Sequence, residues 1–391
     1  MLTSQKYNPE NTPYFNKQGV TIGMGMTEKQ GGSDVRANTT KAVPATSTGL
    51  GEVYKIYGHK WFLSAPMCDA FIVLAQTTKG LSCFLMPRWF SEDSCNHIYI
   101  QQLKNKMGNQ SNASSEVEFR GAYAWLLGEE GRGVATIINM VALTRFDCIV
   151  SSAGMMRQAL IQAIHHCQHR KVSGEYLIDK ALMQNVLTTL VIESDAALAM
   201  SMRIASALDN PESHKEKLLI RITTAIGKYW VCKRAPDFVF EAMECMGGNA
   251  YVETSILARL YRDGPVNSIW EGSGNVQCLD VLRSIERNKE CLDVLFEEIE
   301  LARGMNQYLD NYIDNLKNEI MNKKSLEYKA RIIVEHLAIA FQASLLLRSQ
   351  NTDIAEIFCR LKLSTNPNFL YGGLDEENNC KSILQRAWPH V

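Results

Sequence analysis

The 391-residue sequence lacks an excess of either charge, because 41 Lys and Arg residues stand against 42 Asp and Glu residues. A formal net charge of −1 gives the molecule no overall attraction to nucleic acid or acidic membranes, so such binding would need a local patch. The composition, 46% apolar and 21% charged, also excludes low-complexity and collagen-like chains. An ordinary globular protein with room for two or three domains remains.

The sequence also lacks Cys-x-x-Cys pairs, long apolar runs and an apolar leader. Its 11 cysteines are scattered, and a chain of this length needs no disulfide framework, which predicts reduced and mostly buried thiols. No unbroken apolar run approaches the roughly 20 residues of a membrane helix, and residues 1–19 have no signal-like core. These absences predict a protein of the cytoplasm, or of mitochondria in a eukaryote, that does not contact membranes.

The first part of the chain predicts β structure. Between about residues 20 and 119, short apolar segments alternate with clusters of Gly, Ser, Asn and Asp. The predicted strands include residues 53–57, 71–75, 83–86 and 98–100. This pattern is typical of a compact antiparallel β domain or barrel.

After residue 133 the apolar period becomes helical. Helices are predicted over residues 134–171, 181–208, 215–245 and 332–347, with breaks at 210–213 and at Asp263-Gly264-Pro265. The expected fold class is therefore α+β, a β-barrel-like domain followed by a helical bundle and a further helical domain. The predicted division is an N-terminal remnant (1–19), a β domain (20–130), a bundle (131–284) and a C-terminal helical domain (285–391).

Residues 25–35 form the first candidate for a ligand-binding loop. Paired glycines, hydroxyls and carboxylates follow a predicted strand there, and glycine lets backbone N–H groups approach a planar or phosphorylated ligand. The alternative is a plain tight turn. Two other segments supply context. Residues 58–64 place aromatics beside a hydroxyl, and residues 270–275 precede an apolar helix whose N-terminus could bind an anion.

Together these segments resemble the acyl-CoA dehydrogenase family of flavoenzymes. Residues 25–37 fit its first signature, and residues 244–251, with Arg259 and Asp263, nearly fit the second. The sequences of residues 24–32 and 269–275 resemble those of the AidB-like branch of this family. The resemblance covers the chain from about residue 20 to its end. It implies α,β-dehydrogenation of an acyl-CoA or a related acyl thioester, in which a carboxylate removes the α proton and the β hydride goes to flavin.

The resemblance also implies roles for individual residues. Glu271 stands at the usual base position and Arg145 at a positioning or electrostatic one, with FAD as cofactor and no metal. At the other base position of some members this chain has Thr144, which cannot take a proton. The FAD-binding residues it implies are Met24, Gly25, Met26, Thr27, Gly32, Ser33, Phe62, Leu63, Ser64, Arg170, Ile269, Trp270, Gly272, Ser273, Gly274 and Asn275.

Assembly and completeness are further expectations from the family. Members form homo-oligomers, usually tetramers, and Arg170 would then meet the flavin of a neighbouring subunit. Members also begin with a helical domain of over a hundred residues, whereas only about 20 residues precede the first signature here. Most of that domain is therefore expected to be missing, and the chain could instead be a degenerate fragment without activity.

Two further sets of residues have more than one interpretation. The resemblance to the AidB-like branch also implies an alternative function, a flavoprotein that binds or protects DNA in the alkylation response and has vestigial dehydrogenase activity. Lys323, Lys324, Lys329 and Arg331 would form the basic face for DNA, although neighbouring acids favour a solvated helix. Residues 165–169 carry three histidines and a cysteine, but an i,i+4 pair without a third ligand favours a structural role over a metal site.

Overall fold

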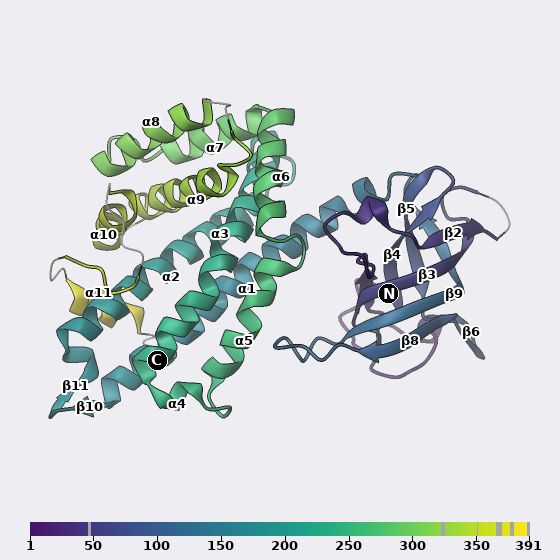
Figure 1. Cartoon of the computed structure of the whole chain (residues 1–391), viewed down its shortest axis with the longest axis horizontal. Coiled ribbons are helices and arrows are strands. Elements are labelled where there is room, and N and C mark those ends of the chain that lie inside the picture. The colour runs from purple at the N-terminus through teal and green to yellow at the C-terminus, as the bar shows by residue number, and fades with distance from the viewer. Residues whose placement is uncertain (46–47, 322–324, 350, 365–369, 376–378, 389–391) are drawn as a thin grey trace. The chain divides into compact units, whose positions relative to one another are not determined.

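The computed structural model describes residues 1–391 except 46–47, 322–324, 350, 365–369, 376–378 and 389–391 (Figure 1). It divides into two compact units, Met1–Val141 and Ala142–Val391. The first unit holds a β-sheet and the second a helical bundle, which confirms the predicted α+β class. The dividing point lies inside α1 (Gly133–His169), and the predicted limits at residues 130 and 284 stay predictions.

The β unit is a seven-stranded sheet with the order β1-β3-β2-β4-β5-β9-β8. Additional pairings of β1 with β4 and of β3 with β9 curl the sheet toward a barrel. Its strands are β1 (Ile22–Gly25), β2 (Lys41–Pro44), β3 (Val53–Ser64), β4 (Ala70–Thr77), β5 (Gly80–Pro87), β8 (Ile98–Leu103) and β9 (Ser114–Leu127). A small hairpin is made by β6 (Trp89–Ser91) and β7 (Ser94–Cys95), and 3-10 turns span Tyr14–Asn16 and Val35–Ala37.

Alternating residues of these strands make the core of the β unit. Tyr54 and Ile56 of β3 pack with Phe71 and Val73 of β4 and Phe84 of β5, all fully or almost fully buried. The period of two puts one face of each strand inward. The four predicted strand segments all lie within observed strands.

The helical unit is built around α1, α2 (Ala181–Leu208) and α3 (His214–Met246). The further helices are α4 (Gly248–Tyr251), α5 (Ile256–Ile269), α6 (Gly274–Arg287), α7 (Glu290–Glu300), α8 (Gln307–Met321), α9 (Ala330–Leu347), α10 (Thr352–Leu363) and α11 (Cys380–Ala387). A short hairpin of β10 (Lys171–Val172) and β11 (Glu175–Tyr176), with the 3-10 turn Leu177–Asp179, joins α1 to α2. One continuous apolar core runs from Ile149 of α1 to Ala387 of α11.

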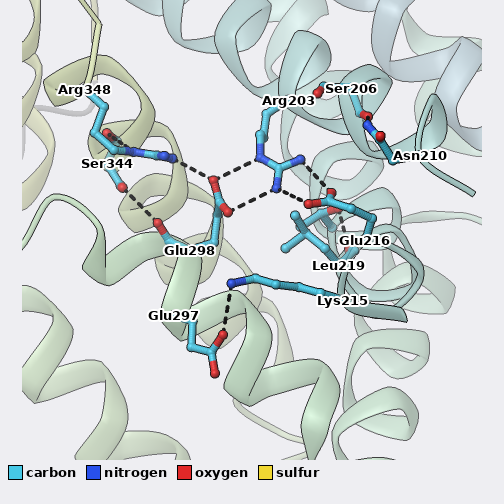
Figure 2. Close-up of polar contacts among 11 residues, drawn as sticks. Arg203, Ser206, Asn210, Lys215, Glu216, Leu219, Glu297, Glu298, Ser344 and Arg348 are labelled. Atoms are coloured by element: carbon cyan, nitrogen blue, oxygen red, sulfur yellow. Dashed lines mark hydrogen bonds and ion pairs between the residues drawn. The ribbon is translucent and has the colours of Figure 1, made fainter. Parts of the chain in front are cut away.

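Ion pairs connect α7 and α9 to α2 and α3 (Figure 2). Arg203 of α2 makes paired hydrogen bonds to Glu216 of α3 and to Glu298 of α7, at 2.8–3.1 Å. Arg348, at the C-terminal end of α9, adds a 2.8 Å bond to Glu298. Because bidentate Arg–carboxylate pairs fix both distance and orientation, this network sets how α7 and α9 lie against α2 and α3.

The predicted break at Asp263-Gly264-Pro265 is wrong. α5 continues through these residues to Ile269, with Pro265 inside the helix. Proline disfavours a helix interior because it lacks an N–H group. Gly264 is buried against Pro236 of α3, however, and this close packing of α5 on α3 overrides the local preference.

The cysteines and the long apolar helices bear on the predictions about thiols and membranes. All 11 cysteines are free and only Cys95 is exposed, as predicted. Among the described helices, α1 and α9 are long and apolar enough to pass a composition test for a membrane span. The buried share of the apolar stretch is 67% for α9, which is typical of a core helix, and 29% for α1.

Candidate functional site

Two of the three predicted motifs meet at one end of the β unit. β1 ends at Gly25, which pairs with Leu63 of β3, and the Trp61 N–H donates a 2.8 Å hydrogen bond to the Thr27 carbonyl. The loop after β1 therefore lies beside the aromatic and hydroxyl motif of residues 58–64. Sequence spacing could not show this contact, because β2 intervenes in the chain.

Glu28 anchors this loop from inside. Its buried carboxylate accepts hydrogen bonds from Thr39 (2.6 and 2.9 Å), from the Thr40 N–H (3.1 Å) and from the buried Lys60 ammonium (2.9 Å). Burial alone would raise the pKa of Glu28, but the Lys60 charge and these hydrogen bonds lower it well below its usual value. The sequence showed no role for Lys60, whose partner is 32 residues away in the chain.

The outer side of the loop is open and small. Gly31 and Gly32 are exposed, and a Cβ added to Gly32 would come within 2.5 Å of the Thr27 hydroxyl oxygen. Ser33 is exposed and Met26 half-buried. At residues 31–33 the loop thus presents backbone and hydroxyl groups, which a ligand can approach closely.

The three predicted binding residues of β3 differ in orientation. Phe62 is 44% exposed and Ser64 is half-buried, whereas the Leu63 side chain lies wholly inside the core. Leu63 can therefore reach a ligand only through its main chain. In the strand before the loop, Gly25 is buried and Met24 half-buried.

The third motif forms the tight connection between α5 and α6 in the helical unit. Glu271 has a left-handed backbone with φ +56°, and Gly272 follows at φ +97°. Such a conformation is unfavourable for a residue other than glycine, and it is found mostly at sites where the surroundings enforce it. Ser273 is the N-cap of α6, where the first turn of Gly274 and Asn275 directs free N–H groups outward.

The carboxyl group of Glu271 lies in a partly desolvated setting. Burial raises its pKa, while a hydrogen bond with Thr144 and the charges of Lys228 and Arg145 counteract part of that rise. The Oε2 atom is buried and has no hydrogen-bond partner among the described residues. A carboxyl with a raised pKa and one free oxygen is suited to accept a proton.

Arg145 contacts the backbone of Glu271 rather than its carboxylate. Its Nε donates a 3.0 Å hydrogen bond to the Glu271 carbonyl, and its Nη1 pairs with Asp280 at 2.7 Å. Arg221 holds the same Asp280 carboxylate at 2.8 Å. Arg145 therefore contacts the turn that carries Glu271, and its positioning or electrostatic role stays a prediction.

Two buried side chains at this turn, Lys228 and Gln277, could not be identified as site residues from the sequence. Lys228 of α3 donates to the carbonyls of Asn267 (3.1 Å) and Gly272 (2.9 Å). Gln277 of α6 donates to the carbonyls of Glu271 (3.0 Å) and Gly272 (2.9 Å). A lysine or glutamine in a helix ordinarily indicates a surface position, so pattern alone could not find these two residues.

The other residues of the helical unit that were predicted to bind FAD differ in exposure. Ile269 is exposed, and the half-buried Trp270 donates through Nε1 to the Cys148 sulfur at 3.1 Å. Arg170 is exposed at the end of α1. The rings of His165 and His169 lie there in a tilted contact, with their centroids 4.4 Å apart, and no group of three metal-binding side chains occurs in the described part of the chain.

Comparison with known proteins identifies the class. Residues 23–122 match the acyl-CoA dehydrogenase middle domain, and residues 131–286 match the acyl-CoA dehydrogenase C-terminal domain. The chain is 43% identical to the putative acyl-CoA dehydrogenase AidB of Escherichia coli over 93% of its own length and 66% of that protein's. The chain belongs to the acyl-CoA dehydrogenase family.

Solved structures agree in fold. ACDH-11 of Caenorhabditis elegans in complex with C11-CoA is 28% identical, with a TM-score of 0.81 over 88% of this chain and 64% of that one. An acyl-CoA dehydrogenase of Bacillus anthracis complexed with FAD has a TM-score of 0.69 at 18% identity, over 86% of this chain and 65% of that one. The chain thus spans just under two thirds of the length of these relatives.

Proposed function

We propose that this protein is an FAD-dependent acyl-CoA dehydrogenase-like oxidoreductase that forms an α,β double bond in an acyl thioester. The observation that carries the proposal is Glu271, whose free, buried Oε2 has no hydrogen-bond partner among the described residues. The raised pKa of this carboxyl makes it a stronger base than an ordinary surface glutamate. FAD supplies the acceptor for the hydride that leaves the β carbon.

The residues present fit an FAD molecule. Gly31 and Gly32 leave the exposed side of the loop without Cβ atoms, and Phe62 presents an exposed ring beside Ser64, as a flat, polar-edged ligand needs. Thr27 and Ser33 supply hydroxyl groups in the same loop. In the helical unit, Ser273, Gly274 and Asn275 open a helix N-terminus suited to a negatively charged group.

The chain's own residues would then perform the proton step. Glu271 takes the α proton at Oε2 as the electron pair of that C–H bond forms the new double bond. Arg145 and Gln277 hold the backbone carbonyl of Glu271, so the turn from which the carboxyl extends stays in place during the transfer. Thr144 makes a hydrogen bond with the same carboxyl group.

The test is visible absorption of the purified chain after reconstitution with FAD. Retention of a flavin spectrum and its bleaching on anaerobic addition of an acyl-CoA support the proposal. Loss of all flavin on desalting removes the cofactor assignment. Retained flavin that no acyl-CoA in a panel of chain lengths bleaches removes the reaction.

Assembly is a separate part of the proposal. We propose a homo-oligomer, a tetramer by resemblance, formed through the helical unit. Leu198 and Met202, one turn apart on α2, are exposed apolar side chains that such contacts would cover. Light scattering of the purified chain tests this, and a monomeric mass at micromolar concentration would contradict it. Arg170 can serve a neighbouring flavin only if the oligomer forms.

DNA binding is the alternative function. In the basic face proposed for it, Lys329 and Arg331 are described at the start of α9, while Lys323 and Lys324 lie outside the described residues. Binding through n phosphate contacts would fall with salt at a log–log slope of roughly −0.9n. Absence of any shift of duplex DNA at low salt would exclude this role without affecting the dehydrogenase proposal.

A further inference from the structure

Lys228 is a buried cation at the back of the Glu271 turn. Its side chain is 1% exposed, and its Nζ donates hydrogen bonds to the carbonyls of Asn267 (3.1 Å) and Gly272 (2.9 Å). These two carbonyls lie on either side of Glu271 in the chain. The ammonium therefore bridges the end of α5 to the start of the turn that carries the proposed base.

The chemistry of this contact is unusual for a purely structural residue. Within the described residues, Lys228 forms no ion pair within 4 Å, and its buried ammonium donates hydrogen bonds to neutral carbonyls. Burying an ammonium group without an ionic partner is strongly unfavourable, and burial lowers the pKa of Lys228 accordingly. An apolar side chain of similar length would avoid that penalty, so retaining lysine here needs another explanation.

The backbone of the turn supplies one explanation. Glu271 is held at φ +56° and Gly272 at φ +97°, conformations that persist only where surrounding contacts enforce them. Arg145 and Gln277 hold the Glu271 carbonyl from α1 and α6, and Lys228 holds the Gly272 carbonyl from α3. Contacts from three helices thus define the turn.

The surrounding charges supply the other explanation. The charges that act on the Glu271 carboxyl are those of Lys228 on α3 and Arg145 on α1. Cys148 on α1 also lies near this carboxyl, Cys232 on α3 lies near Lys228, and Asp280 on α6 pairs with Arg145. Burial raises the pKa of both thiols, Cys148 to about 11 and Cys232 to about 12, so neither adds negative charge near neutral pH. The positive charge of Lys228 therefore acts directly on the carboxylate of Glu271.

We infer that Lys228 is a positioning residue for Glu271, because its ammonium group fixes residues 267–272 and favours the charged, proton-accepting form of the carboxyl. The inference deepens the proposed function and rests on it for its kinetic consequence. Its structural and electrostatic parts can be measured without turnover.

The kinetic experiment compares Lys228→Met, Lys228→Gln and the control Lys217→Met in the FAD-loaded chain. Lys217 lies exposed on the same helix, so it controls for loss of a lysine from α3. Lys228→Met removes both the donors and the charge. We expect kcat to fall roughly 100-fold, as for a base displaced by about 1 Å. The acidic limb of the kcat profile should move to higher pH, because Glu271 loses a charge that lowers its pKa.

Lys228→Gln keeps N–H donors but removes the charge. Like Lys228→Met, it should shift the acidic limb of the kcat–pH profile to higher pH, but it should retain a larger fraction of the parent kcat. If Lys228→Met does not fold, the pH shift in Lys228→Gln still tests the inference. Lys217→Met should match the parent in both respects. An unshifted limb in Lys228→Gln, or kcat within twofold of the parent in a folded Lys228→Met, would overturn the inference.

A measurement without turnover separates this inference from the proposed reaction. The pKa of Glu271 is raised on folding, so its stabilising effect is complete below the unfolded-state pKa and is lost as pH rises through the folded-state pKa. The difference in unfolding midpoint between the parent and Glu271→Gln should therefore change over that window and then level off. In the Lys228→Gln background the levelling should occur at higher pH. The same levelling pH in both backgrounds would contradict the inference even if no acyl-CoA is ever oxidised.

Discussion

Replacing Glu271 by Gln tests the proposed base with little change in shape. The amide is nearly the same size as the carboxyl, and it can keep the contact with Thr144, while the φ of +56° and the bonds from Arg145 and Gln277 involve only the backbone. Folding and flavin binding should therefore survive the change. What is lost is the proton acceptor at Oε2.

The size of the loss follows from the role of the group. A positioned general base contributes roughly 10²–10⁴-fold to a rate, so we expect kcat to fall about 1,000-fold, equivalent to about 4 kcal/mol of transition-state stabilisation. The parent should also lose activity toward acid pH, because Glu271 cannot accept a proton once it is protonated. Its raised pKa places that limb above the range of an ordinary glutamate, and the limb should be absent from any residual activity of Glu271→Gln.

The assay is single-turnover bleaching of the flavin by an acyl-CoA under anaerobic conditions, followed from acid to alkaline pH. The flavin spectrum before substrate addition controls for cofactor content. Bleaching by Glu271→Gln at the parent rate would refute the assignment of the base. A variant that no longer retains FAD would show instead that Glu271 contributes to binding.

Three further predictions concern the β unit and the helical core. Glu28→Gln breaks a fully buried ion pair with Lys60, and chemical unfolding should show a loss of about 3–5 kcal/mol at neutral pH, against about 0.5 kcal/mol or less for the exposed control Glu118→Gln. The Glu28 contribution should be present above the unfolded-state pKa and disappear as pH falls through the lowered folded-state pKa, so equal stability of parent and variant at pH 7 would contradict it. Gly32→Val places a Cβ within 2.5 Å of the Thr27 hydroxyl oxygen, so the loop must shift, and the variant should retain at least tenfold less flavin and melt at a lower temperature; undiminished flavin absorbance would exclude the loop as a binding site. Arg203→Met removes the cation shared by Glu216 and Glu298, of which only Glu298 keeps a second partner among the described residues, Arg348, and it should lower the melting temperature by several degrees; an unchanged melting curve would show that the network in Figure 2 contributes little.

Features of the fold that depend on local pattern could be predicted from the sequence. Residues 181–208 were expected to be helical, and α2 spans Ala181–Leu208, because a strong apolar period ends at a loop containing Pro211. The break expected at Pro265 failed because close packing of Gly264 on Pro236 overrides the local preference of proline. Packing between distant segments leaves no local signal.

The same distinction applies to the candidate site. Glu271 was located through its motif, but the left-handed backbone and the free Oε2 depend on α1, α3 and α6 together. Glu28 was noted only as a member of the first signature, while its partner Lys60 is in another strand. Lys228 resembles a surface lysine in sequence and is almost wholly buried in the structure. These roles arise from tertiary contacts that spacing cannot encode.

The most direct test of the central claim is the visible spectrum of the FAD-reconstituted chain during anaerobic titration with a panel of acyl-CoAs. We predict that the parent protein retains flavin and bleaches with at least one member of the panel, whereas Glu271→Gln retains the same flavin and does not bleach on that time scale. A parent chain that holds no flavin, or one whose flavin no acyl-CoA reduces, would contradict the account.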